Sequence, residues 1–486
     1  MPMLLALLIL VPIVGAVLAL LARGRSVQVL ALVFSAGAAG LGLYLVAWHW
    51  GSLANAAGAL PSATAPEGDL VGVVFDPLSA LMLIVAVGIG FLVVLFSVDY
   101  VGPRNVEHPY QDGSRRYYFW LLLFIGSMVG VALSPNLLQL FIFWELTTLC
   151  SWALIRHSGT SKSVAAGRKA LVMTSIGGLF FVAALALLFF STKSFGFSAL
   201  ASAALSEKMR SLLFFRLLVA VWAKVAQIPF HTWLADTAEA PAPVSAYLDA
   251  AAMATAGAYL MARIVLAGHL HLPGMGVLML VTSLLTMFVA LLFYFVQDDL
   301  KRLLAYSTIA HLGYVLFGIS LGMLGSEQGY QGGVLHMVTH GFAKGTLFLA
   351  VGAIAYAAGT RSLRELSGLG RAMPLVGLSF FVGAFAVTGV PPLSCFWSKF
   401  LILVGTVGLH SWVGPVLLVL VLAESVISFG WFLYVGQKVF WGQPSPATNH
   451  AKQRISGMMA AALVILMAMC VLAPWIGMPL IRMLVP

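Results

Sequence analysis

Long runs of apolar residues follow one another along nearly the whole chain and are separated by short polar loops. A helix that crosses the hydrocarbon core of a membrane needs roughly 20 such residues, so about fourteen spans are expected. The runs are too long and too uniform for the strands of a membrane barrel, which alternate over about ten residues. The expected spans lie near residues 3–22, 27–48, 75–97, 117–134, 137–155, 170–191, 212–230, 243–266, 274–296, 303–323, 331–357, 374–409, 413–440 and 456–479.

Composition supports the same fold class. Of the 486 residues, 61% are hydrophobic and 9% are charged, whereas a soluble domain is about a quarter charged. An all-α polytopic membrane protein is therefore predicted. The chain has no glycine-rich phosphate loop, CxxC pair or soluble domain, so no cofactor or metal is expected on it. Cys150, Cys395 and Cys470 lie within predicted spans and are interpreted as small apolar core residues.

The basic residues are distributed unevenly between the two sets of loops. The net charge of +10 could suggest a nucleic-acid partner, but the distribution instead follows the positive-inside rule when the N-terminus is outside. We therefore expect a multi-pass protein of a bacterial or archaeal cytoplasmic membrane and no nucleic acid. The predicted cytoplasmic loops hold 17 of the 26 lysines and arginines: Arg23, Arg25, Arg104, Arg115, Arg116, Arg156, Lys162, Arg168, Lys169, Lys301, Arg302, Arg361, Arg364, Arg371, Lys438, Lys452 and Arg454.

A few charged residues remain inside the spans. An ionised side chain at the bilayer centre costs at least about 2.5–3.5 kcal/mol, so such residues usually face a polar interior and are functional. In "LHMVTHGFAKGTLF", His336, His340 and Lys344 recur at four-residue steps and share one helix face. The other candidates are Glu145 in the fifth span, Lys224 in the seventh, Asp249 in the eighth, Lys399 in the twelfth and Glu424 in the thirteenth.

This set of residues suits proton transfer. Burial makes a lysine release its proton more easily, and a nearby carboxylate makes the lysine retain it. Histidine can pass a proton between its two ring nitrogens. Acids and bases could instead form buried ion pairs that only hold helices together, and either histidine could be a packing residue. A metal site at His336 and His340 would need further ligands and is opposed by the nearby lysine. Because the charges recur across successive helices, a relay is favoured.

Prolines predict two interrupted helices. Pro229 lies in the seventh span and Pro391–Pro392 in the twelfth, and proline breaks or kinks a helix. Discontinuous helices in corresponding positions of two halves mark the binding site in many transporters. The chain is therefore predicted to contain two repeats, spans four to eight and nine to thirteen. The expected domains are an N-terminal three-helix region (1–114), two half-channel repeats (115–270 and 271–441) and a C-terminal helix (442–486).

Several segments resemble the proton-conducting, antiporter-like membrane subunits of the complex I superfamily. They are "FIFWELTTLCSWALI", "AKVAQIPFHTWLADTAEAPAPVSAYLDAAAMATAGAYLMAR", "DDLKRLLAYSTIAHLGY", "HMVTHGFAKGTLF" and "GVPPLSCFWSKF". That group includes large membrane-arm subunits of respiratory NADH:quinone oxidoreductase, their equivalents in membrane-bound hydrogenases, and large subunits of multi-subunit Na+/H+ (Mrp) antiporters. The resemblance covers residues 115–440 in matching order.

The resemblance implies fourteen helices, two inverted five-helix repeats and broken helices seven and twelve. It implies that Glu145 is the family's helix-five glutamate and that Lys224 is its partner lysine. Separation of this pair would release a proton toward an exit near Lys399. The central lysine and its histidines would be Lys344, His336 and His340.

The sequence departs from the family pattern at two positions. Where Asp249 stands, many relatives carry a histidine, so the link between the two half-channels is expected to differ. Where Gly178 stands, some relatives carry an aspartate that tunes the acid–lysine pair. Glu424 has no role that the resemblance transfers.

Three interpretations of function follow. The leading one is a proton-translocating subunit of a redox-driven complex, of the hydrogenase or NADH:quinone oxidoreductase type, with Lys399 and "AEAPAPVSAY" favouring the hydrogenase branch. The partners would then include homologous membrane subunits, and partner subunits of the complex would carry iron–sulfur clusters and flavin or nickel–iron. No electron-transfer site is expected on this chain. The alternatives are a subunit of a Na+/H+ antiporter without redox chemistry, in which Na+ also moves, and an inactive scaffold.

Overall fold

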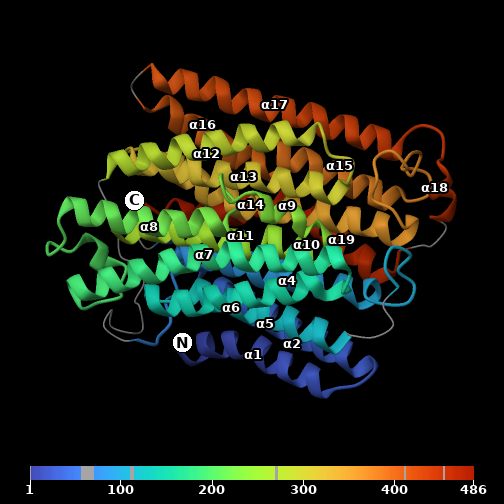
Figure 1. Cartoon of the computed structure of the whole chain (residues 1–486), viewed down its shortest axis with the longest axis horizontal. Helices are drawn as coiled ribbons and strands as arrows, with labels where there is room; N and C mark the ends of the chain where they lie inside the picture. The colour runs from blue at the N-terminus through green and yellow to red at the C-terminus, as the bar shows by residue number, and fades with distance from the viewer. Residues whose placement is uncertain are drawn as a thin grey trace.

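The computed structural model describes residues 2–55, 70–109, 114–268, 272–409, 412–451 and 455–485. Within these ranges the chain is helical, and its β-structure is limited to isolated bridges at Asn136–Gly196 and Asp299–Ser362. The predicted all-α class is confirmed. Long helices lie side by side, from α1 and α2 at one edge of the molecule to α16 and α17 at the opposite edge (Figure 1).

Twelve segments of the described chain are long and apolar enough to cross a membrane. Apart from α7, which begins nine residues before the expected span, their bounds lie within four residues of the expected ones, because long apolar runs specify them directly. They comprise α1 (Pro2–Leu21), α2 (Arg25–Trp48), α4 (Pro77–Tyr100), α5 (Ser114–Leu133), α6 (Leu137–Ile155), α7 (Ser161–Thr192), the pair α10 (Ala242–Ala250) and α11 (Met253–Gly268), α12 (Pro273–Tyr294), α13 (Leu300–Met323), α14 (Glu327–Ala358), α17 (Val413–Phe440) and α19 (Gly457–Ile481). Short elements are α3 (Trp50–Asn55), α18 (Pro446–His450), η1 (Arg156–Ser158), η2 (Ser198–Ala201) and η3 (Thr237–Glu239).

The seventh and twelfth spans are built from pairs of shorter helices, as predicted. The seventh consists of α8 (Glu207–Lys224) and α9 (Thr232–Asp236), and the twelfth of α15 (Pro374–Thr388) and α16 (Ser394–Val407). Both breaks contain a cis proline peptide, Ile228–Pro229 and Pro391–Pro392. The twelfth span turns at Gly389, whose φ of 90° suits glycine.

The broken backbone finds new hydrogen-bond partners inside the protein. The indole nitrogen of Trp233 donates to the carbonyl of Ala223, at 2.8 Å, on the far side of the first break. At the second break, the amino group of Lys399 donates to the carbonyl of Thr388, at 3.3 Å. Such bonds allow irregular backbone at membrane depth because an unsatisfied polar group there is costly.

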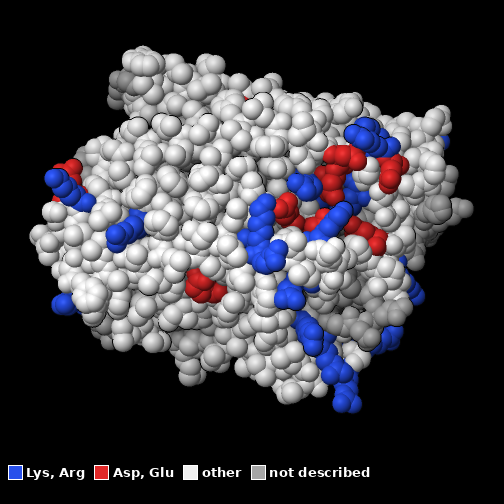
Figure 2. All heavy atoms as spheres, viewed as in Figure 1, with Lys and Arg blue, Asp and Glu red and all other residues white. Residues whose placement is uncertain are grey.

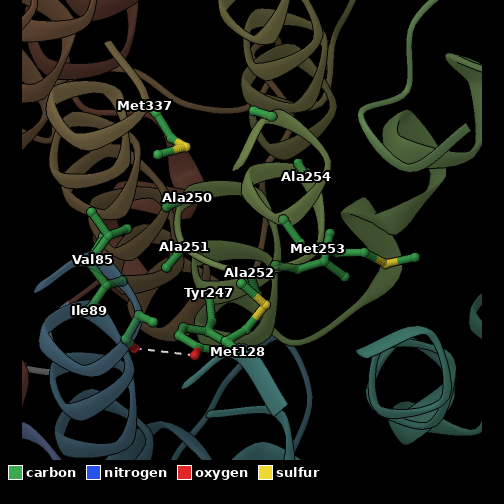
Figure 3. Packing of buried hydrophobic residues seen from close by; sticks show 14 of the residues in the cluster. Val85, Ile89, Met128, Tyr247, Ala250, Ala251, Ala252, Met253, Ala254 and Met337 are labelled. Carbon is green, nitrogen blue, oxygen red and sulfur yellow. Dashed lines mark hydrogen bonds between the residues drawn. The ribbon is translucent and has the colours of Figure 1, made fainter. Parts of the chain in front are cut away.

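A third break, which the sequence did not predict, divides the eighth span between α10 and α11. No proline stands there, and the residues are the small Ala250, Ala251 and Ala252. Figure 3 shows these alanines packed among α4 and α14, with Tyr247 donating to the carbonyl of Ala86 at 3.2 Å. A Cβ atom at Gly341 of α14 would lie only 2.8 Å from the carbonyl oxygen of Ala250. The close approach of α14 therefore accompanies the break.

Helices α13 and α14 form the centre of the molecule. Every residue in the most apolar window of each is buried, whereas fewer than half of the residues in the corresponding windows of α17 and α1 are buried. Polar side chains on α13 and α14 therefore face other helices and not lipid. Because each predicted repeat contains five spans, the second repeat enters the membrane from the side opposite to the first. The four-part domain division itself stays a prediction.

Two basic residues are deeply buried. Arg263, near the end of the expected eighth span, is buried in α11 and forms a bidentate ion pair with Asp76, the N-cap residue of α4. Lys301 was expected in a cytoplasmic loop, but it is buried in the first turn of α13 and donates to the carbonyl of Ala240. Elsewhere, on the face drawn in Figure 2, charged side chains gather mainly toward one end of the helices.

Candidate functional site

The first pair of candidate residues lies where α6, α7 and α8 meet. The amino group of Lys224 is fully buried and donates to the carbonyl of Trp144, at 2.7 Å, and to the hydroxyl of Thr148, at 2.8 Å. Its nitrogen also lies 4.7 Å from the centroid of the Trp144 ring. Glu145 is the next residue on α6, yet no ion pair joins it to Lys224 within the described chain. The acid and the lysine are neighbours that do not touch.

Glu145 rests against α7 at Gly178. A Cβ atom at position 178 would lie 2.6 Å from Oε1 of Glu145, so an aspartate could not be accommodated there unless the glutamate moved. The same Oε1 has no hydrogen-bond partner among the described residues. Glu145 is the only acidic residue of α6 and α7. Glu145 as a residue is only partly buried, and the missing side chain at Gly178 makes room for its carboxylate against α7.

Asp249 lies at the end of α10, beside the third break. It is fully buried, and neither carboxylate oxygen has a hydrogen-bond partner among the described residues. The positive charges of Lys344 on α14 and of Lys301 on α13 attract the Asp249 carboxylate. The amino group of Lys344 donates to the carbonyl of Leu304, at 3.0 Å. Asp249 therefore stands at the junction between the first repeat and the central helices.

Three histidines stack between α13 and α14. His336 and His340 lie on α14 as predicted, and His311 of α13 joins them, with ring centroids 5.3 and 5.4 Å away. Nδ1 of His311 lies 3.1 Å from Nε2 of His336, and Nδ1 of His336 lies 2.8 Å from the hydroxyl oxygen of Ser398. Nε2 of His311 and Nε2 of His340 have no partner among the described residues. The three rings therefore form a chain in which two ring nitrogens lack a hydrogen-bond partner among the described residues.

We call the line of titratable groups from Glu145 through Lys224, Asp249, Lys344 and the histidines to Glu424 the row. Lys399 and Glu424 lie at its far end and are joined by hydroxyl groups. The amino group of Lys399 donates to Ser425, at 3.0 Å, and lies 4.4 Å from the ring centroid of Tyr314. The Tyr314 hydroxyl donates to Oε2 of Glu424, at 2.5 Å, and lies 2.7 Å from the Ser425 hydroxyl. Tyr314 also stacks on His311, with centroids 5.5 Å apart. Glu424, which the family resemblance left without a role, therefore lies beside the last lysine.

Within the described residues, the one hydrogen bond, ion pair or ring contact between two predicted site residues is the stacking of His336 on His340, with ring centroids 5.9 Å apart. The second half of the row is continuous from the histidines to Glu424. No side-chain hydrogen bond within the described residues joins Lys224 to Asp249 or Asp249 to Lys344. Gln227, in the first break, reaches from one half toward the other, and its amide nitrogen lies 3.5 Å from the carbonyl oxygen of Ile309 on α13.

Sequence reasoning missed His311 and Tyr314. Both lie in "LLAYSTIAHLGY", in the middle of an apolar span, so the criterion that selected His336 would also have selected His311. Tyr314 gave no comparable signal because a tyrosine is common in apolar helices. In the part of the chain that is described, no group of three His, Cys, Asp or Glu side chains is arranged to hold a metal ion.

The fold and this row define a class of protein: a polytopic helical membrane protein with interrupted helices and a line of buried titratable groups at its centre. Residues 134–428 match the family described as NADH:quinone oxidoreductase/Mrp antiporter, TM. Residues 70–109 match the family described as the N-terminus of NADH-ubiquinone oxidoreductase (complex I) chain 5. The chain belongs to this family of antiporter-like membrane subunits of the complex I superfamily.

Relatives come from both branches of the family. The chain is 34% identical over 352 residues to the chloroplast NAD(P)H-quinone oxidoreductase subunit 5 of Physcomitrium patens, covering 68% of this chain and 46% of that protein. It is 35% identical over 395 residues to Na(+)/H(+) antiporter subunit A1 of Staphylococcus haemolyticus, covering 76% and 48%. The chain thus spans about half the length of the curated relatives it matches.

Two solved structures share the fold. A chain of the Mrp complex from Dietzia sp. DQ12-45-1b superposes with a TM-score of 0.84 and 27% identity, covering 99% of this chain and 51% of that one. A chain of an archaeal membrane-bound sulfane sulfur reductase superposes with a TM-score of 0.83 and 23% identity, covering 99% and 97%. The second likeness, at this identity, is one of fold.

Proposed function

We propose that this chain translocates protons across the membrane as one subunit of a redox-driven ion-pumping complex. The observation that carries the proposal is the row of buried titratable groups along α6, α8, α10, α13, α14, α16 and α17. Placing so many ionisable groups at membrane depth is costly, and such groups typically mark proton relays. The relative named as a quinone oxidoreductase subunit supports the redox setting, and the relative named as a Na(+)/H(+) antiporter subunit supports ion movement.

In the first half, we propose that Glu145 controls Lys224. When the carboxylate swings toward the amino group, its charge favours the protonated lysine, and when it swings away the lysine releases its proton. The separated arrangement fits the second condition, because Lys224 donates to Trp144 and Thr148 while Oε1 of Glu145 is unpaired. Glu145 is only partly buried and Oε1 has no hydrogen-bond partner among the described residues, so no such bond has to break for this movement.

In the second half, a proton would pass from Lys344 through the histidines toward Lys399 and Glu424. An imidazole can accept a proton on one nitrogen while it donates from the other. The short His311–His336 contact and the His336–Ser398 contact supply two links of such a chain. Tyr314 then connects the stacked rings to Glu424 through its hydroxyl. Asp249 would link the two halves by its charge on Lys344.

We further propose the setting of the subunit. It lies in a bacterial or archaeal cytoplasmic membrane with its N-terminus outside, beside homologous membrane subunits. Partner subunits carry iron–sulfur clusters with flavin or nickel–iron, and the electron transfer takes place there. Labelling of single cysteines tests the orientation in intact cells. They are introduced at Ser26, an exposed residue in the first turn of α2, and at Ala204, an exposed loop residue on the predicted opposite side. A reactive cysteine at position 26 with a protected one at position 204 would overturn it.

The second candidate is a subunit of a multi-subunit Na+/H+ antiporter without redox chemistry. The relationship to the antiporter subunit of Staphylococcus haemolyticus favours it. Purification of the native complex separates the two candidates. Stoichiometric iron and acid-labile sulfide would support the redox complex, whereas a cofactor-free assembly that exchanges Na+ for H+ would replace it.

The relay is tested by Lys344→Ala in the assembled complex. The substitution removes the central amino group, and we expect proton translocation into membrane vesicles to fall to background. Lys162→Ala serves as the control because Lys162 is an exposed lysine at the start of α7. A native gel must show equal assembly of both variants. Normal translocation by an assembled Lys344→Ala complex would remove Lys344 from the route.

A further inference from the structure

A cavity opens where α2, α4, α5 and α19 meet, far from the row of titratable groups. It lies at the end of the bundle that carries the predicted cytoplasmic loops and has a volume of about 610 Å³. This volume lies in the range of roughly 300–1,000 Å³ that is typical of small-molecule sites. Arg25, Gln28, Val98, Asp99, Arg104 and Met458 are among its lining residues.

Two arginines give the cavity a cationic mouth. Arg25 and Arg104 are exposed, and neither forms an ion pair with a carboxylate of the described chain. Asp99 is the one acidic residue among the described residues that line the cavity. A guanidinium presents several N–H donors in a planar fork that matches a phosphate group. The free arginines therefore favour a phosphate-bearing ligand.

Helix ends strengthen the positive potential. Helix α2 begins at Arg25, α5 at Ser114 and α19 at Gly457, one residue before the lining residue Met458. A helix N-terminus carries a partial positive charge and unpaired N–H groups, and so it attracts anions. The cap residue of α2, Gly24, has no side-chain acceptor to satisfy these groups. Three helix N-termini at the cavity face two helix C-termini, those of α4 and of α1, which ends at Leu21.

An apolar stripe runs from the cavity toward the middle of the membrane. On α4, the partly exposed residues are Gly88, Phe91, Leu95, Val98 and Asp99, and the rest of the helix is buried. Gly88, Phe91, Leu95 and Val98 recur every three or four residues and so lie on one face, which we call the α4 stripe. At 1.5 Å per residue the stripe is about 15 Å long. That is about half of the ~30 Å hydrocarbon core, the depth of one leaflet.

We propose that this cavity binds an anionic glycerophospholipid of the cytoplasmic leaflet. Its phosphate lies between Arg25 and Arg104, its polar head reaches Gln28 and Asp99, and an acyl chain follows the α4 stripe. The length of the stripe favours a lipid over a transmembrane helix of a partner, which would need contact across the whole core. The proposal does not depend on the proton-transfer function, because no residue of the row lines the cavity.

The test measures lipid binding to the purified full chain. The protein is delipidated in a neutral detergent, and native mass spectrometry follows the addition of phosphatidylglycerol, phosphatidylethanolamine or phosphatidylcholine with identical acyl chains. We expect at least one phosphatidylglycerol to bind with at least tenfold preference over the other two lipids. The Arg25→Gln/Arg104→Gln variant should bind it about 10- to 30-fold more weakly, since each arginine near an anionic head group contributes about fivefold.

Two controls distinguish a lipid site from non-specific attraction of anions. Lys162→Gln/Arg168→Gln removes two exposed cations on α7, near the same end of the bundle, and should leave binding unchanged. Glycerol 1-phosphate, which has the head-group chemistry without acyl chains, should not bind measurably. Equal binding of the three lipids, equal loss in both double variants, or a crosslink from Cys introduced at Phe91 to a partner subunit in the native complex would each overturn the proposal.

Discussion

Each buried lysine of the row donates to a main-chain carbonyl and not to a carboxylate. The partners are Trp144 for Lys224, Leu304 for Lys344 and Thr388 for Lys399. A carbonyl accepts a hydrogen bond from both the charged and the neutral amine, so it holds the side chain in place through a change of protonation. A carboxylate in the same place would fix the charged form. The geometry therefore suits groups that gain and lose protons.

A substitution at Gly178 tests whether the position of the Glu145 carboxylate matters for proton translocation. A methyl group from Gly178→Ala would lie 2.6 Å from Oε1 of Glu145, so the carboxylate must move. We expect proton translocation to change at least severalfold. Stability should change little, because the displaced atoms are the end of a flexible side chain.

The control for this substitution is Gly40→Ala on α2, where the added Cβ meets no atom within 4 Å. Vesicle-based proton translocation and thermal unfolding in detergent are measured for both variants. Equal translocation by both would show that the position of Glu145 against α7 is unimportant.

A substitution at Tyr314 tests the end of the row at Lys399 and Glu424, where the proton is proposed to leave. Tyr314→Phe keeps the ring that lies over Lys399 and His311 but removes the hydroxyl that joins Glu424 to Ser425. We expect a loss of about 1–3 kcal/mol in stability from the unpaired acid and a decrease of translocation of at least fivefold. Tyr434→Phe, at an exposed tyrosine of α17, is the matched control. If both variants translocate equally, Glu424 is a packing residue.

At the scale of elements, glycine determines how closely α13 and α14 pack. A Cβ atom at Gly318 would lie 2.6 Å from the Cα atom of Gly333 and 2.8 Å from the carbonyl oxygen of Gly329. Small residues allow such close approach in membrane helices, where packing and not the hydrophobic effect drives association. The contact aligns His311 with the histidines of α14, so helix packing controls the spacing of the relay.

Gly318→Ala should therefore destabilise the protein by about 1–3 kcal/mol, because backbone atoms would have to move apart. Gly430→Ala, on the exposed side of α17 where a Cβ meets nothing within 4 Å, should be neutral or slightly stabilising. The midpoint of thermal unfolding in detergent distinguishes them. An unchanged midpoint for Gly318→Ala would mean that the two helices can separate without cost.

The helix breaks show what a linear pattern can and cannot predict. Pro229 and Pro391–Pro392 predicted the breaks of the seventh and twelfth spans, because proline lacks an N–H group and clashes with the preceding turn. The break after Ala250 had no such signal, since alanine is the best helix former. Here tertiary contact outweighs local preference, and this break places Asp249 at the end of a helix.

At the scale of the whole molecule, a buried ion pair joins the N-terminal region to the first repeat. Arg263 of α11 contacts both carboxylate oxygens of Asp76 and donates to the hydroxyl of Tyr259, at 2.6 Å. That hydroxyl in turn donates to the carbonyl of Ala132 on α5, at 2.7 Å. The cluster ties three helices together near one end of the bundle, on the side opposite to the cavity at α2.

Asp76→Asn should destabilise the protein by about 3–5 kcal/mol, because it leaves a buried guanidinium without its counter-charge. Adding Arg263→Gln should restore part of the loss, since the uncompensated charge is then removed. Thermal unfolding of the single and double variants gives the comparison. Purely additive losses would show that the two charges do not depend on each other.

The sequence by itself determined the number and bounds of the membrane spans and the identity of most charged groups within them. This was possible because transfer of a segment into a membrane depends on the composition of that segment, which can be read directly from the linear sequence. Only the tertiary structure decided which groups meet. It placed Lys224 on a carbonyl and away from Glu145, added His311 to the row, and paired Glu424 with Tyr314. Those contacts join residues far apart in the chain, and they depend on how the side chains of neighbouring helices fit together.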